Sequence, residues 1–177
     1  MDDFNLMIST TMYLIGSFWL LLGAVCYAQD LVSPPCATKI LEYATHTLPL
    51  HGKLQQSDAF IYVDIDDDYI HKLLEFIKEE GFQPPPYFRS PNKVGAHITL
   101  LYPDELRNSP LINIQEINQD IDFTLQECLF VHPPMWEEMQ RICIITVQSL
   151  QLDELRKKYG FPQKAHDFHI TIGVTPK

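Results

Sequence analysis

Two short phrases in the sequence carry the side chains best suited to chemistry. Residues 97–100 read His-Ile-Thr-Leu, and residues 169–172 read His-Ile-Thr-Ile. Side chains on an extended strand alternate between two faces, so each His shares a face with its Thr while the aliphatic residues point the other way. Each phrase therefore predicts an imidazole and a hydroxyl side by side, backed by hydrophobic core.

These residue types suit the hydrolysis of a phosphodiester bond. Histidine has an unperturbed pKa of about 6.5, so one imidazole can act as a base and another as an acid near neutral pH. Two threonine hydroxyls can donate hydrogen bonds to the charged phosphoryl oxygens. The near-identity of the two phrases leaves open which histidine is the acid and which is the base.

The first phrase follows a regular series of predicted elements. Residues 59–65 are β-branched and aromatic, as is typical of a strand. A helix is expected next, because apolar residues recur at helical spacing over 70–77, and Gly81 followed by Phe82 ends it. A proline-rich loop over 84–89 then leads to His97.

The second half repeats this series. A strand is expected over 141–147, a helix from near Asp153, an end at Gly160, and a loop over 162–167 before His169. A further strand over 123–131 should pair with residues 141–148 as a hairpin. This duplication predicts two lobes related by a pseudo-twofold axis, with the two phrases facing one another.

With these paired motifs and this duplicated order, residues 58–177 resemble the 2H phosphodiesterase superfamily, which is named for its two His-x-Thr/Ser motifs. The branch of RNA-ligase-like proteins and cyclic phosphodiesterases is the most similar. The resemblance implies an α+β fold, a duplicated two-lobed unit with antiparallel sheets lining a central cleft and helices outside. It implies that the catalytic residues are His97, Thr99, His169 and Thr171.

The resemblance also implies a reaction. The expected substrate is the 2′,3′-cyclic phosphate of a nucleotide or an RNA end, because opening a strained ring needs only an acid–base pair. Neither a metal nor another cofactor is predicted.

Loop side chains are the candidates for holding the rest of the substrate. Aromatic rings can stack a base and cations can bind a phosphate, although such rings also pack and such cations are also solvated. The candidate substrate-binding residues are Tyr87, Arg89, Lys93, Tyr102 and Phe168, with Phe88 and Trp136 as further rings that could stack a base.

Three alternatives remain beside this interpretation. The same fold could cleave a 2′,5′-phosphodiester or remove 3′-terminal nucleotides from short RNA. A two-lobed module could bind a nucleotide without turning it over, although the intact His/Thr pairs argue against it. A metal site at His166, Asp167 and His169 is disfavoured, because a strand would send the two histidines to opposite faces.

Charge restricts the partners. The formal net charge is −10, so no large cationic surface is expected to attract long duplex nucleic acid. We expect a nucleotide or a short RNA end as substrate, and a monomer.

The first residues differ from the rest. Residues 13–27 form an apolar run whose length suits a signal peptide, and Cys26 and Ala28 fit a cut after Ala28. Asp2 and Asp3 precede the run where a signal normally carries a positive charge. We expect export by a cleaved signal to the periplasm or outside the cell, with an uncleaved membrane anchor as the alternative.

These expectations divide the chain into three parts. Residues 1–28 would be the signal or anchor, residues 29–57 a leader segment, and residues 58–177 the catalytic domain. The lobes are expected at about 58–105 and about 120–177.

Export would allow disulfides to persist. The hairpin predicted between 123–131 and 141–148 would set Cys128 and Cys143 opposite each other. A disulfide and two separate buried thiols both remain open.

Overall fold

A computed structural model describes residues 35–57, 60–89, 94–107, 113–134, 136–164 and 166–177. The predicted signal peptide or anchor lies outside the described residues. Among the described residues, no helix has the length and apolar character needed to cross a membrane.

The described chain contains seven strands, four α-helices and three short 3-10 helices. The strands are β1 (His51–Gln56), β2 (Ile61–Asp64), β3 (His97–Leu101), β4 (Asp120–Asp122), β5 (Thr124–Val131), β6 (Met139–Gln148) and β7 (Phe168–Pro176). The α-helices are α1 (Pro35–Thr47), α2 (Asp68–His71), α3 (Pro103–Arg107) and α4 (Leu150–Lys158). The 3-10 helices are η1 (Leu73–Phe76), η2 (Lys78–Glu80) and η3 (Pro86–Arg89).

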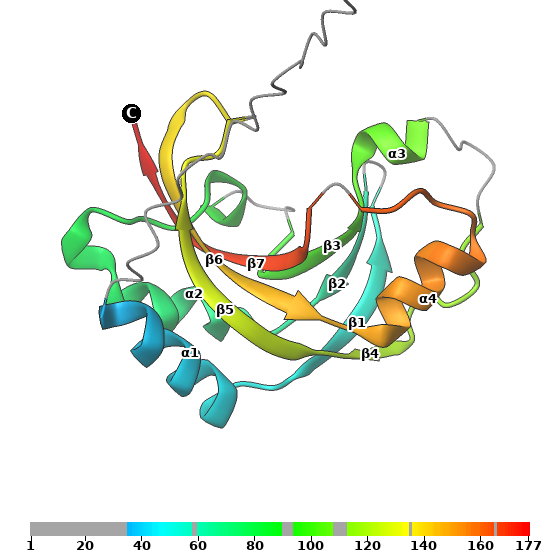
Figure 1. Cartoon of the computed structure of the whole chain (residues 1–177), viewed down its shortest axis with the longest axis horizontal. Coiled ribbons are helices and arrows are strands. Elements are labelled where there is room, and N and C mark those ends of the chain that lie inside the picture. The colour runs from blue at the N-terminus through cyan, green and yellow to red at the C-terminus, as the bar shows by residue number, and fades with distance from the viewer. Residues whose placement is uncertain (1–34, 58–59, 90–93, 108–112, 135, 165) are drawn as a thin grey trace, which may run out of the picture.

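All seven strands form one antiparallel sheet in the order β4-β1-β2-β3-β7-β6-β5. The sheet curls into an open half-barrel with α1, α2 and α4 on its outside (Figure 1). The α+β class, the antiparallel pairing and the external helices confirm the predicted fold. The two lobes are joined into a single sheet where Ile98 of β3 pairs with Ile170 of β7.

The central strands are two-faced, as their alternating sequence predicts. Ile98 and Leu100 of β3 and Ile170 and Ile172 of β7 are at most 1% exposed and belong to the main core. The residues between them on each strand are only half-buried. The core therefore lies between the outer face of the sheet and the helices, and the concave face presents the other side chains.

Two glycines end the helical segments of the two halves. Gly81 follows η2 at φ 85°, and Gly160 follows α4 at φ 71°. These are left-handed conformations, which glycine adopts without the steric cost of a Cβ. Both predicted helix ends are therefore confirmed, although the first helix is broken into α2, η1 and η2.

The expected leader segment is part of the fold from residue 35 onward. In α1, Ala37, Ile40 and Ala44 lie on one face at helical spacing and enter the main core. Strand β1 pairs with β2 on one side and with β4 on the other. Residues 35–56 therefore complete the sheet and its cover, which the sequence alone did not indicate.

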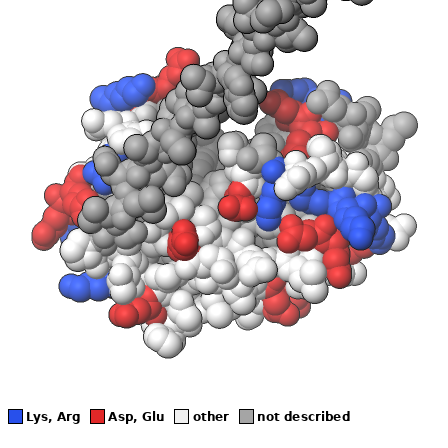
Figure 2. Space-filling model, in the orientation of Figure 1, with Lys and Arg blue, Asp and Glu red and all other residues white. Residues whose placement is uncertain are grey.

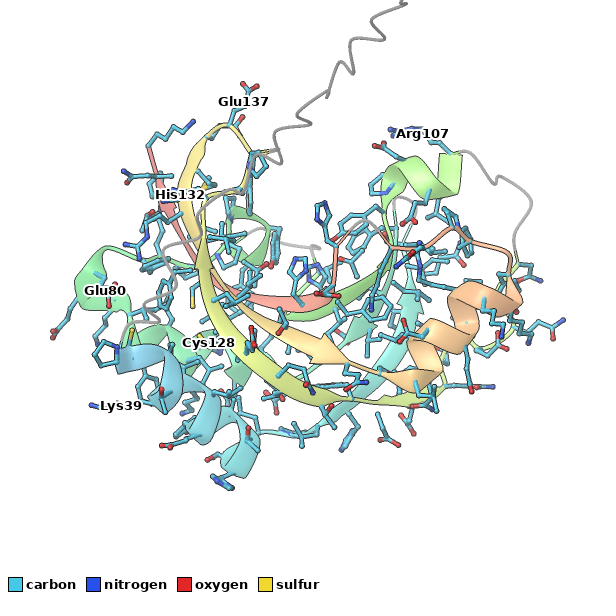
Figure 3. The ribbon with its side chains drawn as sticks, viewed as in Figure 1. Lys39, Glu80, Arg107, Cys128, His132 and Glu137 are labelled. Atoms are coloured by element: carbon cyan, nitrogen blue, oxygen red, sulfur yellow. The ribbon has the colours of Figure 1, made fainter. Side chains whose placement is uncertain are left out.

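The β5–β6 hairpin forms as predicted, with a different register at its cysteines. Cys128 pairs with Ile145, and Cys143 pairs with Phe130, so the two cysteines are diagonal neighbours. Their sulfur atoms are 3.8 Å apart, and both are buried free thiols. Cys128 lies on β5, near α1 (Figure 3).

Candidate active site

The four predicted catalytic residues come together at the junction of the two lobes. Because Ile98 and Ile170 are antiparallel partners, their neighbours are paired as well: His97 lies across from Thr171, and Thr99 lies across from His169. All four side chains are half-buried, whereas Ile98 and Ile170 between them are fully buried. The quartet therefore occupies one face of the sheet and has approximate twofold symmetry.

Both imidazoles are held by the same local contact. Nδ1 of His97 lies 2.8 Å from the carbonyl oxygen of Gly95, and Nδ1 of His169 lies 2.8 Å from the carbonyl oxygen of Asp167. In each case Nδ1–H donates to a carbonyl two residues earlier, which leaves Nε2 as the acceptor of the neutral ring. Each histidine therefore keeps one nitrogen available for a substrate.

The environment disfavours the charged form of both rings. Burial lowers the pKa of His97, the hydrogen bond to Gly95 partly opposes this, and the charge of His169 lowers it further. Burial likewise lowers the pKa of His169, where the carbonyl and carboxylate of Asp167 oppose the shift and His166 adds to it. The charge of His169 therefore reaches His97, as expected for two rings on one face of paired strands.

The backbone before His97 is fixed from the first lobe. A carboxylate oxygen of Asp67 accepts a hydrogen bond from the Ala96 nitrogen at 2.8 Å, and the Ile65 nitrogen donates to the Ala96 carbonyl at 3.1 Å. A Cβ added to Gly95 would lie 2.1 Å from that carboxylate oxygen. The carbonyl that orients His97 therefore belongs to a tightly packed turn.

Three aromatic rings surround His97. The ring centroids of Phe60, Tyr62 and Tyr87 lie 5.4, 5.8 and 5.0 Å from that of His97. Phe60 and Tyr62 also contact each other, with centroids 4.9 Å apart. Tyr87 comes from η3, whereas Tyr62 comes from β2, the strand beside β3.

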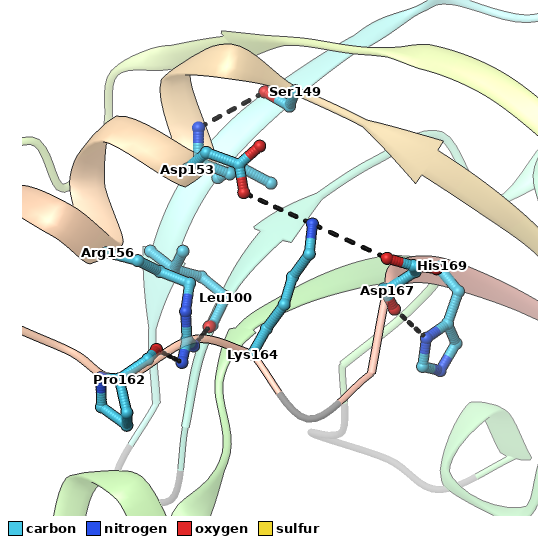
Figure 4. A network of polar contacts seen from close by, with 9 residues as sticks. Leu100, Ser149, Asp153, Arg156, Pro162, Lys164, Asp167 and His169 are labelled. Atoms are coloured by element: carbon cyan, nitrogen blue, oxygen red, sulfur yellow. Dashed lines mark hydrogen bonds and ion pairs between the residues drawn. The ribbon is translucent and has the colours of Figure 1, made fainter.

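The neighbourhood of His169 is polar instead. Lys164 Nζ lies 3.3 Å from a carboxylate oxygen of Asp153 and 3.9 Å from one of Asp167 (Figure 4). The same lysine lies over the Phe168 ring, 4.1 Å from its centroid. These contacts join α4 to the start of β7 and support the turn whose carbonyl orients His169.

Arg156, which is buried, holds the other end of the loop before His169. Arg156 of α4 donates at 2.8 Å to the carbonyls of Leu100 and Pro162, and its guanidinium pairs with Glu105 of α3 at 2.5 Å (Figure 4). Arg156 is 6% exposed, so this pair is shielded from water. It ties α4, the end of β3 and the loop before His169 together.

Two of the predicted substrate-binding residues lie at the quartet. Tyr87 packs against His97, and its hydroxyl interacts with the Thr171 side chain, which opposes the rise in its pKa caused by burial. The Tyr102 hydroxyl is near enough to raise the pKa of Tyr87 further. Tyr102 is 39% exposed, so it lies at the edge of the site.

The other candidates are placed differently. Phe168 is 3% exposed and alternates with His169, so it faces the core and cannot stack a bound base. Phe88 packs edge-on against His71, and Trp136 packs against Met139, Ile142 and Val174. Arg89 ends η3 with its side chain outside the described part, and Lys93 is outside it altogether.

Sequence reasoning missed Phe60, Tyr62 and Asp67. Tyr62 alternates with buried Ile61 and Val63, so strand alternation is the signal that could have shown that it faces away from the core. What the pattern lacked was the pairing of β2 with β3, which brings Tyr62 opposite Thr99.

Histidine, cysteine and carboxylate side chains are the groups that could bind a metal ion. Across the described ranges, no three His, Cys, Asp or Glu side chains are grouped closely enough to hold a metal ion. A hollow of about 480 Å³ beside α4, lined by Asp153, Lys157, Lys164 and their neighbours, contains neither catalytic histidine.

Comparison with known proteins agrees with this geometry. A model of the Swiss Army Knife 2H phosphoesterase domain matches residues 61–177. Searches of curated proteins and of solved structures found no match. Because the family model covers most of the chain, the chain belongs to the 2H phosphoesterase family, and it is a phosphoesterase of that superfamily.

Proposed function

We propose that the protein hydrolyses the 2′,3′-cyclic phosphates of nucleotides or RNA ends by two-histidine acid–base catalysis. One imidazole takes a proton from water as the water oxygen bonds to phosphorus. The other imidazole protonates the ribose oxygen as its bond to phosphorus breaks. The product carries a 2′- or 3′-phosphate monoester on its ribose. The two histidines exchange protonation states in the reaction.

A single observation carries this proposal. The pairing of Ile98 with Ile170 sets two imidazoles and two hydroxyls on one face, with both Nδ1 atoms engaged by backbone carbonyls. The two Nε2 atoms are left for opposite sides of one phosphorus atom, as in-line displacement requires. In this proposal Thr99 and Thr171 donate hydrogen bonds to its non-bridging oxygens.

The uncharged character of the quartet favours a small, singly charged phosphodiester. The rings next to His97 are aromatic, and Lys164, which contacts the turn before His169, is already paired with carboxylates. A cyclic phosphodiester carries one negative charge and releases ring strain when opened. It therefore needs less charge compensation than a phosphate monoester.

The proposal is tested with the four nucleoside 2′,3′-cyclic monophosphates as substrates for the full chain. We expect turnover to a single monophosphate isomer, and full activity in the presence of EDTA. The product isomer is identified by chromatography against 2′- and 3′-monophosphate standards. Absence of turnover, or activity that EDTA abolishes and only added metal restores, would contradict the proposal.

A further inference from the structure

We propose that Phe60 and Tyr62 form a nucleobase-binding subsite beside His97, so that nucleoside 2′,3′-cyclic monophosphates are preferred over cyclic phosphates that lack a base. This inference rests on the proposed function and names the substrate class of the same site. It assigns a binding role to two residues of β2 and the turn before it.

The two rings lie on the same face of the sheet as the quartet. Tyr62 is the cross-strand partner of Thr99, and partners in an antiparallel pair share a face. The rings of Phe60 and Tyr62 lie 4.9 Å apart and tilted by 32°, and both contact the His97 ring. Both side chains are only half-buried, so the pair is in part accessible from the concave side.

The pseudo-twofold symmetry shows that these rings are not required by the fold. In the second lobe, Ile144 of β6 pairs with Thr171 as Tyr62 pairs with Thr99. The equivalent position thus holds an aliphatic residue, which packs in a separate cluster with Met139, Ile142 and Val174. One lobe therefore offers aromatic rings next to its catalytic pair, and the other offers an aliphatic wall.

The position of the rings fits the shape of a nucleotide. Strand order places β2 on the side of β3 away from β7, so Phe60 and Tyr62 lie beyond His97 as seen from His169. A phosphate between the two histidines would have aromatic rings on one side only. The base, which projects from the ribose to one side of the cyclic phosphate, would lie over this aromatic pair.

Tyr87 has a different part in the subsite. Its ring is edge-on to His97, and its hydroxyl is buried against Thr171. Its contacts are satisfied within the protein, so it forms a wall of the site. Phe60 and Tyr62 remain as the stacking surface.

Stacking of one base on an aromatic side chain supports a preference of about 5-fold to about 150-fold for a cyclic phosphate with a base over one without. The test compares adenosine 2′,3′-cyclic monophosphate with glycerol 1,2-cyclic phosphate, which has the same five-membered ring and no base. We expect Tyr62→Ile, which copies the residue of the second lobe, to lower kcat/KM for the adenosine substrate at least about 10-fold, mainly through KM. The value for the glycerol substrate should change less than about 2-fold.

Two further variants separate stacking from support of His97. Tyr62→Phe keeps the ring and should retain the selectivity of the unmodified protein, which also shows whether the position tolerates substitution. Ile144→Ala, at the pseudo-equivalent position, should leave the ratio of the two kcat/KM values unchanged. Thermal melts of all variants establish that they fold.

The outcomes distinguish this inference from the proposed function. Equal losses for both substrates in Tyr62→Ile would mean that Tyr62 only supports His97, and would overturn the subsite. Equal kcat/KM values for the two substrates in the unmodified protein would overturn the subsite while leaving the hydrolysis intact. No turnover of either substrate would contradict the proposed function, and the subsite with it.

Discussion

His97 and His169 each use one ring nitrogen to bind the protein and keep the other for chemistry. The carbonyls of Gly95 and Asp167 fix the tautomer and the ring orientation in the same way. This equivalence supports the proposal that two positions far apart in the sequence supply the two halves of one proton exchange. Their surroundings differ, since aromatic rings enclose His97 whereas a lysine–carboxylate network supports the turn before His169.

Loss of either imidazole should remove most of the activity. We expect His97→Ala and His169→Ala each to lower kcat for a nucleoside 2′,3′-cyclic monophosphate by about 100-fold to about 10,000-fold, since each variant loses one proton-transfer group. His132→Ala is the matched control, because Nδ1–H of His132 also donates to a carbonyl, that of Gln140 at 2.7 Å, but the side chain is exposed at the far end of the hairpin (Figure 3). Normal kcat in either catalytic variant would exclude the two-histidine mechanism.

A plot of kcat/KM against pH should be bell-shaped, with its maximum on the acid side of neutral pH. The proposed mechanism uses one neutral and one charged imidazole, and burial lowers the pKa of both histidines below the usual value of about 6.5. As pH rises, the charged ring loses its proton at a lower pH than a free histidine would. We therefore expect kcat/KM to peak below about pH 6.5 and to fall toward neutral pH.

A profile of kcat/KM from pH 4 to 9 measures this shift, because kcat/KM reports the pKa values of the free enzyme. The charge of one ring disfavours a second charge on the other, so the acid and alkaline limbs of the pH profile should lie further apart than those of two independent histidines. An optimum well above pH 7 would mean that other charged groups dominate the site.

At the scale of the elements, the sequence predicted the parts that rest on local patterns. Alternating burial located β3, β6 and β7, and glycines at 81 and 160 marked the helix ends. The helix after β2 breaks into short pieces, although its apolar spacing is helical: α2 is followed by η1 and η2, with Ile77 between the last two at φ −130° and ψ 0°, outside the helical region. The register at the cysteines was missed because the turn of the hairpin sets it: Val131 pairs with Ile142 beside the turn, which places Cys128 opposite Ile145 rather than Cys143.

The parts that were missed depend on contacts between distant segments. Tyr62 reaches Thr99 through the pairing of β2 with β3, and α1 reaches the core by packing against β5 and η1. Phe168 has the composition of a stacking residue, but strand alternation next to His169 turns it into the core. Motif and repeat therefore predicted that the quartet shares one site, whereas the candidates for binding the rest of the substrate required the tertiary structure.

The turn before His97 gives a prediction about positioning. In Gly95→Ala the new Cβ would displace the Asp67 carboxylate from the Ala96 nitrogen and move the carbonyl that orients His97. We expect kcat to fall about 10-fold or more, and the free energy of unfolding to fall by about 1–3 kcal/mol because a buried donor loses its acceptor. Steady-state kinetics and urea unfolding measure the two effects.

Substitutions of Asp67 provide the controls. Asp67→Ala removes the same acceptor and should reproduce the loss, whereas Asp67→Asn keeps a carbonyl oxygen at this position and should stay close to the unmodified protein. If Asp67→Ala had normal kcat, the turn would not position His97.

At the scale of the whole molecule, charge sets which substrates approach easily. The formal net charge is −10, and the largest group of basic side chains in Figure 2 lies over α4, whose last turn contains Lys157 and Lys158, while other basic side chains are scattered over the opposite side of the view. Acidic residues surround this patch in the same view. The protein as a whole therefore repels a polyanion, and a mononucleotide experiences this repulsion least.

Salt should thus affect long and short substrates differently. Raising NaCl from about 20 mM to about 200 mM screens the repulsion, so we expect kcat/KM to rise about 2-fold to about 5-fold for an RNA of about ten nucleotides ending in a cyclic phosphate. For the mononucleotide the change should stay below about 2-fold. A fall for the RNA, as in proteins that bind phosphates through cations, would show an attractive surface instead.

The strand order of the sheet has a consequence for biosynthesis. Strand β7 comes last in the sequence, yet it lies between β3 and β6 and carries half of the quartet. Until residues 168–176 leave the ribosome, β3 and β6 each present an unpaired edge, and the nascent chain holds two unjoined half-sheets. A premature stop before residue 168 would therefore yield an aggregation-prone product rather than a weakly active enzyme.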